Sequence, residues 1–157
     1  MDAVSQPRAD GMNSAHRSLN LESRIESVEQ AENEVLAFAR AAGFEEDTQH
    51  QIAMAVREIV VNAISHGNAY DLNKHVQVEL RLSPESLLIA IQDEGRGFDP
   101  GDLPDPLAPE NLLRQSGRGL LLARAFMDEV ELIPGPHGTE VRMRKRRREA
   151  NASGHKN

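Results

Sequence analysis

Hydrophobic residues recur every three or four positions in two segments of the chain, which is the spacing of one face of a helix. The first helix is expected to end at Gly43, and the second to end at residues 66–68. The two apolar stripes are Val28, Ala31, Val35, Phe38, Ala39 and Ala42, followed by Ile52, Val56, Ile59, Val60 and Ala63. Both helices are expected to begin with a capping box, formed by Ser27 with Gln30 and by Thr48 with Gln51.

Alternating or continuous apolar runs predict strands in the first two thirds of the chain. Residues 17–23 alternate weakly and are a candidate first strand. Residues 75–83 and 86–94 are separated by the turn-forming pair Pro84-Glu85, a pattern that favours an antiparallel hairpin. The second strand is apolar nearly throughout, which is typical of a central strand that is covered on at least one face.

The rest of the pattern completes the fold prediction. Residues 99–116 hold four of the eight prolines and are expected to form an irregular loop. Residues 117–130 predict a helix behind a glycine-rich entry, and residues 130–145 a second hairpin around residues 135–138. Helices that interrupt a mixed, mostly antiparallel sheet predict an α/β (α+β) two-layer sandwich with the helices on one face.

Composition bounds the class of protein. A chain of 157 residues is expected to form one domain, with a flexible arm at residues 1–16, the domain at 17–145 and a basic, disordered tail at 146–157. The absence of cysteine excludes disulfides and thiolate metal sites. No stretch approaches the roughly 20 apolar residues that span a bilayer, and the N-terminus lacks the apolar core of a secretory signal. We therefore expect a soluble cytoplasmic protein without a membrane partner.

The charge is unevenly distributed along the chain. A net charge of −7 argues against general nucleic-acid binding, which phosphate neutralisation drives. Residues 142–148, however, hold six of the eighteen lysines and arginines. This run is either a nucleic-acid tail or a last strand that continues into a solvated, disordered end. The second interpretation is favoured because no aromatic residue is interleaved for base stacking, so no direct nucleic-acid partner is expected.

The second predicted helix carries a candidate catalytic pair. Glu58 and Asn62 are four residues apart, so they share one helical face, rotated away from the apolar stripe. A carboxylate with an amide oxygen one turn away suits a hard cation such as Mg²⁺, or a general base beside a metal-bound phosphate. A solvated helix face would show the same pair, and the pair alone favours that alternative.

Two glycine-rich segments are candidates for ligand contacts. Gly117 and Gly119 stand before an apolar helix, whose free N–H groups and positive dipole end favour an anion, although a plain helix entry fits as well. Asp93 ends the central strand in the run "QDEGRGF", where Gly95 and Gly97 follow. The carboxylate could accept a hydrogen bond from the exocyclic amine of adenine, with the ring against bare backbone. A strand-end turn is an equal alternative.

The order of these motifs resembles the Bergerat ATP-binding fold of gyrase, heat-shock chaperone ATPases, histidine kinases and MutL-type repair ATPases. The segments follow in the family's order and cover roughly residues 17–145. A Glu-x-x-x-Asn helix is followed by Asp-x-Gly-x-Gly-Phe at a strand end. A proline-rich loop, a Gly-x-Gly helix start and a Gly-Thr strand start then complete the series.

Within that group the chain is similar to the compact bacterial anti-sigma-factor serine/threonine kinases of sporulation and stress response. The resemblance lies in "REIVVNAISHGN", "IQDEGRGFDP" and "GRGLLLARAFMDEVEL". It implies a kinase that binds ATP and Mg²⁺, dimerises, holds a sigma factor inactive and phosphorylates a serine of a STAS-domain anti-anti-sigma factor. The alternatives are an ATP-dependent switch that sequesters a regulator without kinase activity, and a switch kinase that binds no sigma factor.

For the transfer of phosphate, the resemblance implies these roles. Glu58 would be the general base that takes the proton of the substrate hydroxyl. Asn62 would bind the Mg²⁺ that bridges the phosphates. The phosphates themselves would be held by Gly117, Arg118 and Gly119.

For the base, the resemblance implies that Asp93 reads the adenine amine, with Gly95 and Gly97 shaping the pocket and Thr139 supporting it. The loop Asp99–Ser116 would form a lid.

Two residues beside these positions differ from the usual family pattern. Arg57 precedes the expected base, and a guanidinium folded back onto Glu58 would weaken that base. Glu94 adds a second carboxylate next to Asp93, and strand alternation predicts that it faces solvent.

Overall fold

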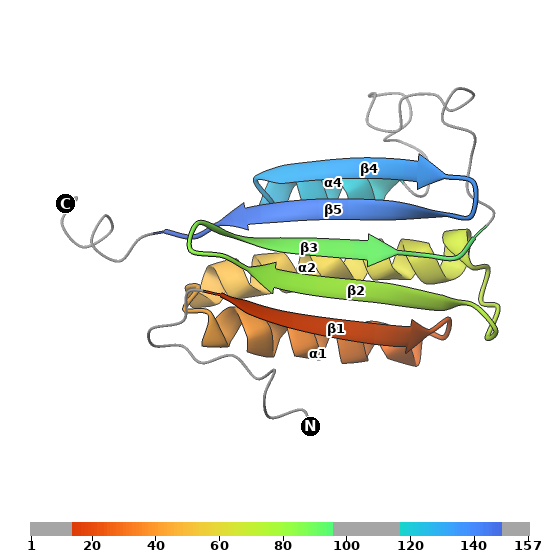
Figure 1. Cartoon of the computed structure of the whole chain (residues 1–157), viewed down its shortest axis with the longest axis horizontal. Helices are drawn as coiled ribbons and strands as arrows, with labels where there is room; N and C mark the ends of the chain where they lie inside the picture. The colour runs from red at the N-terminus through yellow and green to blue at the C-terminus, as the bar shows by residue number, and fades with distance from the viewer. Residues whose placement is uncertain (1–13, 96–116, 149–157) are drawn as a thin grey trace.

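The computed structural model describes residues 14–95 and 117–148, with the side chains of residues 117 and 118 left out. These residues form a five-stranded sheet with its helices on one face, as the pattern predicted (Figure 1). The strand order is β1-β2-β3-β5-β4. The strands are β1 (Ala15–Glu22), β2 (His75–Leu82), β3 (Ser86–Gln92), β4 (Glu129–Gly135) and β5 (Gly138–Arg146). All four described strand pairings are antiparallel, in line with the mostly antiparallel sheet that was expected.

Strand register separates an apolar face from a polar face. One row of residues crosses the whole sheet and is buried or half-buried against the helices: Leu19, Val78, Ile91, Val141 and Leu132. The neighbouring row points to the opposite face: Ser18, Glu79, Ala90, Arg142 and Glu131. Because side chains alternate along a strand, this register puts the apolar set under the helices and leaves the polar set on the open face.

Within residues 14–95 and 117–148, three α-helices and one π-helical turn cover the apolar face. They are α1 (Glu26–Ala41), α2 (Glu46–Asn62), the π-helix η2 (Ala63–Gly67) and α4 (Gly117–Phe126). Every residue of the two predicted apolar stripes is buried. Figure 1 shows α4 behind β4 and β5, α2 behind the middle of the sheet and α1 behind β1. In the described ranges, no helix is long and apolar enough to cross a membrane.

The predicted capping boxes are wrong. In α1, Ser27 lies inside the helix and is buried, and α2 begins two residues before Thr48. Neither N-cap residue of these two described helices makes a side-chain cap hydrogen bond. Backbone turns start the helices instead, with the N–H of Ser27 bonded to the Arg24 carbonyl and the N–H of Gln49 to the Glu45 carbonyl. Acidic residues in both first turns favour the positive ends of the helix dipoles.

The last helix is shorter than predicted. It ends at Phe126, where the expected range reached residue 130. Asp128 is already bonded to the sheet, because its N–H donates to the Arg144 carbonyl of β5 at 2.9 Å. Strand β4 therefore begins at residue 129. The predicted proline-rich loop at residues 99–116 lies outside the described residues.

The basic run near the C-terminus contacts the ends of two helices. Lys145 Nζ donates to the Phe126 carbonyl at 2.8 Å, and Arg147 Nη2 donates to the Ala42 carbonyl at 3.3 Å. Arg147 Nη1 also donates to the Ser83 carbonyl at 3.0 Å. Cations at helix C-termini stabilise the negative ends of the helix dipoles. This part of the run therefore belongs to the domain, whereas the sequence suggested a solvated, disordered end.

Candidate functional site

The Glu58 and Asn62 pair lies on the face of α2 that meets α4. A Cβ built on Gly119 would come within 2.5 Å of Asn62 Nδ2 and 3.5 Å of Glu58 Cβ. No side chain fits there, so the first turn of α4 packs directly on the pair. The N-terminus of a helix favours anions through its free N–H groups and its dipole. The structure thus brings together three of the predicted residues: the carboxylate of Glu58, the amide of Asn62 and Gly119 in the first turn of α4.

Arg57 does not fold back onto the expected base. Its Nε lies 3.8 Å from Glu32 Oε1 of α1, and the side chain is about half exposed. Adjacent helical positions point about 100° apart, which directs this guanidinium toward α1 while Glu58 faces α4. The possible interference of Arg57 with Glu58 is therefore not observed.

Asp93 is buried directly after β3, and its carboxylate is held in one orientation. Its Oδ1 accepts hydrogen bonds from the backbone N–H groups of Gly95 and Thr139, both at 3.0 Å. The backbone N–H of Asp93 in turn donates to the Thr139 carbonyl at 3.1 Å. Three of the predicted residues are therefore joined by direct hydrogen bonds. Since Oδ1 already has two donors, Oδ2 is the oxygen suited to accept a further hydrogen bond.

Gly67 is a site residue that the sequence analysis missed. A Cβ at this position would lie 2.2 Å from Asp93 Oδ2, and the Gly67 carbonyl oxygen would lie 2.2 Å from a Cβ on Gly95. The end of η2 and the end of β3 therefore meet backbone to backbone. Gly138 completes the contact with φ at +145°, because a Cβ there would lie 2.2 Å from the Asp93 carbonyl oxygen. The glycine in "HGN" after the predicted helix was the available signal.

The π-helical turn explains how Gly67 reaches Asp93. After Asn62 the helix widens, and the N–H of Asn68 donates to the Ala63 carbonyl five residues earlier at 2.8 Å. Short π-helical segments are rare and occur frequently at functional sites. Here the wide turn connects the Glu58 and Asn62 face directly to the glycine that contacts Asp93.

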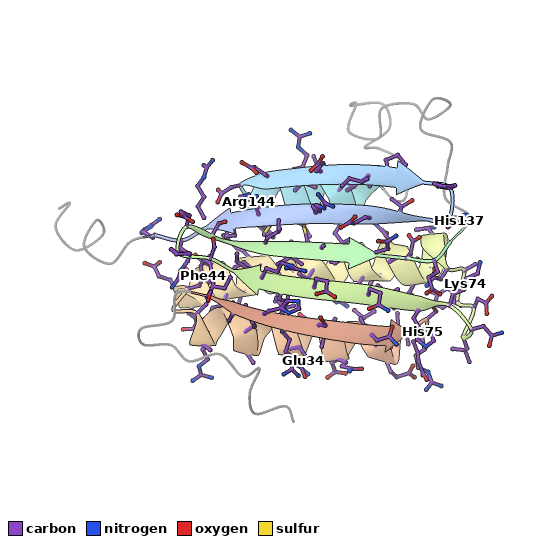
Figure 2. All side chains as sticks on the ribbon, in the orientation of Figure 1. Glu34, Phe44, Lys74, His75, His137 and Arg144 are labelled. Carbon is purple, nitrogen blue, oxygen red and sulfur yellow. The ribbon has the colours of Figure 1, made fainter. Side chains whose placement is uncertain are left out.

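Glu94 faces solvent, as strand alternation predicted, but it is not without a role. Its Oε1 accepts the backbone N–H of His75 at 3.0 Å, which joins the end of β3 to the start of β2. Figure 2 shows Lys74, His75 and His137 at this same end of the sheet. The Asp93 site therefore lies at the end of the sheet where β2 begins and β4 turns into β5.

Three predicted site residues are described only in part or not at all. Gly97 lies outside the described residues, and so does the expected lid Asp99–Ser116. Gly117 and Arg118 begin α4, but their side chains are not described. In the parts of the chain that the structure describes, no group of three or more histidine, cysteine, aspartate or glutamate residues could hold a metal ion. A cation at Glu58 and Asn62 would need further ligands, such as phosphate oxygens or water.

Comparisons with known proteins agree with this fold. Residues 21–145 match the histidine kinase-like ATPase domain family. The anti-sigma F factor of Oceanobacillus iheyensis is 36% identical over 126 residues, covering 73% of this chain and 85% of the relative. The anti-sigma F factor of Clostridium perfringens strain SM101 is 32% identical over 136 residues, covering 78% of this chain and 94% of the relative.

A solved structure shares the fold. The crystal structure of the RsbU and RsbW domains of Rv1364c from Mycobacterium tuberculosis superposes with a TM-score of 0.64 at 19% identity. The match covers 85% of this chain and 33% of that longer chain. At this identity the likeness concerns the fold alone.

Proposed function

Since the chain belongs to the histidine kinase-like ATPase domain family and, within it, to the anti-sigma-factor kinases, we propose that it is an ATP-dependent serine/threonine protein kinase. It acts as an anti-sigma factor in a bacterial partner-switching system. Its substrate is a serine of a STAS-domain anti-anti-sigma factor, and its other partner is a sigma factor. The relatives that carry the name anti-sigma F factor support the partner class.

The fixed carboxylate of Asp93 is the observation that carries the proposal. Two backbone N–H groups hold Oδ1, and glycines 67, 95 and 138 surround the side chain without any Cβ. A rigid acceptor beside bare backbone suits a planar base that offers an amine, as adenine does and guanine at the same ring position does not. Asp93 thereby selects ATP over GTP, with Gly97 and Thr139 completing the base pocket.

The residues at the start of α4 and on α2 fit the phosphates and a magnesium ion. Gly119 leaves space that a Cβ would fill beside Asn62, and the helix start supplies N–H donors together with Gly117 and Arg118. Asn62 supplies an amide oxygen, a ligand type that Mg²⁺ accepts. Bound Mg²⁺ with ATP would neutralise charge that develops on the transferred phosphoryl group.

Glu58 takes the proton of the substrate hydroxyl. Its place one turn before Asn62, with its Cβ 3.5 Å from a Cβ built on Gly119, supports a carboxylate beside the region proposed for the phosphates. A general base contributes typically about 10²–10⁴-fold to the rate. A pure binding switch would require nucleotide contacts but no base, so the presence of Glu58 at this place favours the kinase over sequestration alone.

The proposal is tested with γ-labelled ATP, Mg²⁺ and purified candidate STAS-domain proteins from the same organism. We expect label on a serine of the STAS protein with the wild type and its near loss with Glu58→Gln. Glu46→Gln, at the exposed first turn of the same helix, is the matched control and should transfer label normally. Tight complex formation without label would instead identify an ATP-dependent binding switch.

The remaining partners require separate measurements. We propose a homodimer, which light scattering on the purified protein measures directly. Sigma-factor binding is measured by co-purification with candidate sigma factors in the presence of ADP or ATP. Phosphorylation of the STAS protein without any sigma-factor complex would identify a switch kinase of another kind.

A further inference from the structure

Asn68 is a buried polar residue that no part of the proposed chemistry uses. It follows η2, and its side chain is almost fully inaccessible. Its Oδ1 accepts the backbone N–H of Glu94 at 2.7 Å. Its Nδ2 donates to Ser23 Oγ at 2.9 Å and to the His75 carbonyl at 3.1 Å. One amide therefore joins the chain after β1, the start of β2 and the end of β3.

The hydrogen-bond partners require an amide at this position. The Glu94 N–H can only donate, and the His75 carbonyl can only accept. The buried Ser23 hydroxyl donates to the Lys74 carbonyl at 2.5 Å, so its oxygen is left to accept from Asn68. Asparagine presents one acceptor and two donors in a plane, which satisfies the whole set. An aspartate would face the His75 carbonyl with an oxygen, and an apolar residue would leave buried groups unsatisfied.

The bond from Glu94 to Asn68 is one of two backbone hydrogen bonds that hold the end of β3 around Asp93. On one side, the backbone N–H of Asp93 is bonded to the Thr139 carbonyl of β5. On the other side, the next N–H, that of Glu94, is bonded to Asn68. The backbone at the strand end is thus held from two directions. This double attachment fixes the direction in which the Asp93 side chain leaves the backbone.

We propose that Asn68 is a positioning residue of the nucleotide site, which acts through Asp93 and links the base pocket to the β1–α1 junction at Ser23. The inference rests on the proposed function, because it assumes that Asp93 selects adenine. Asn68 makes no contact with the nucleotide in this scheme. Its effect on binding arises only from holding the end of β3.

A double-mutant cycle between Asn68 and Asp93 tests the proposal. Dissociation constants of ADP and GDP are measured by calorimetry for the wild type, Asn68→Ala, Asp93→Asn and the double variant. We expect Asn68→Ala to weaken ADP about tenfold and to reduce the preference for ADP over GDP. In the Asp93→Asn background the same change should weaken ADP less than about twofold, because coupled residues are non-additive. A tenfold loss in both backgrounds would overturn the proposal.

Ser86→Ala separates a positioning role from a general loss of stability. Ser86 is buried at the opposite end of β3, where its Oγ accepts a hydrogen bond from Arg144 Nη1 at 2.9 Å. This variant should be less stable to denaturant yet keep the wild-type ADP affinity and the ADP over GDP preference. An equal loss of preference in Ser86→Ala and Asn68→Ala would show that Asn68 has only a structural effect, and the proposal would fall.

Ser23→Ala is the milder variant if Asn68→Ala does not fold. It removes one acceptor of Asn68 but leaves the bond to Glu94. It should reduce the ADP over GDP preference by a smaller factor than Asn68→Ala, and an unchanged preference would contradict the link to the β1–α1 junction. A wild type that does not bind ADP overturns both the proposed function and the inference. A wild type that prefers ADP, with the preference unaltered in the variants, overturns the inference alone.

Discussion

Replacing Gly67 with alanine tests the contact between η2 and the Asp93 carboxylate most directly. The new Cβ would lie 2.2 Å from Asp93 Oδ2, 2.5 Å from its Cγ and 2.9 Å from its Cβ. Among the described glycines, positive φ angles occur at Gly43 and Gly138 and not at Gly67, so the backbone itself accepts alanine. The whole effect of the substitution therefore arises from the collision with Asp93.

The size of the effect follows from the hydrogen bonds of the carboxylate. Non-bonded heavy atoms approach to about 3.5 Å, so the side chain of Asp93 must retreat by roughly 1 Å. That movement breaks the bonds from Gly95 and Thr139, now 3.0 Å each. Hydrogen bonds to charged groups contribute about 1.5–3 kcal/mol each, so we expect the loss of both to lower the free energy of unfolding by about 3–6 kcal/mol. Loss of one such bond to the base would weaken ADP roughly 10–100-fold.

The assay combines urea denaturation with calorimetric titration of ADP. Gly135→Ala is the matched control, because a Cβ there would meet only the Gly138 carbonyl oxygen at 3.4 Å. This control should be close to the wild type in both measurements. If Gly67→Ala also binds ADP like the wild type and keeps its stability, the carboxylate is not held as described, and the explanation of base selection is wrong.

Three further substitutions have defined outcomes. Glu58→Ala should keep ADP affinity and lose about 10²–10⁴-fold in phosphotransfer, measured by transfer of label to the STAS protein, and normal transfer would exclude a general-base role. Gly119→Ala should weaken ATP more than adenosine in calorimetry, because its Cβ would displace Asn62 beside the phosphates; equal weakening of both would contradict this placement. Burial raises the pKa of Glu79, but hydrogen bonds with His16 and Ser18 and nearby positive charge outweigh it, so the pKa lies below its ordinary value of 4.5. A lowered pKa stabilises the folded protein above that value, so the stability deficit of Glu79→Gln, measured by denaturation, should be present at pH 6 and shrink as the pH falls below about 4.5; a constant deficit would contradict it.

The fold could be predicted from the sequence because the residues with helical or strand spacing of apolar side chains are the ones that the structure buries along most of the described chain. The helical stripe around Val35 and the continuous apolar run of β3 favour helices packed on one face of a sheet. Helix starts were predicted less well, since the capping pattern at Ser27 is a local preference that burial of this side chain overrides. The contacts of Lys145 and Arg147 with helix ends depend on where the sheet places β5, which local sequence does not encode.

Only those parts of the candidate site that lie within short local motifs could be predicted from the sequence. The spacing of Glu58 and Asn62 gives their common face, and "DEGRG" gives a strand end with a carboxylate. The "HGN" run marks Gly67 as a helix end but does not reveal its contact, because Asp93 lies 26 residues later and meets Gly67 only in the folded chain. Asn68 was missed for the same reason, since its partners come from three separate segments.

The π-helical turn at residues 63–67 makes the length of this part of the chain a constraint in its own right. It contains one residue more than a regular α-helix needs to make the same turn, so deleting any one of its residues would restore the α-helix. The chain beyond would then be rotated by about 100°, and Gly67 and Asn68 would leave Asp93 and Glu94. Gly67 apart, evolution can therefore exchange residues in this turn more readily than it can remove one. Among relatives, an alignment gap at this turn would mark chains that must build their base pocket differently.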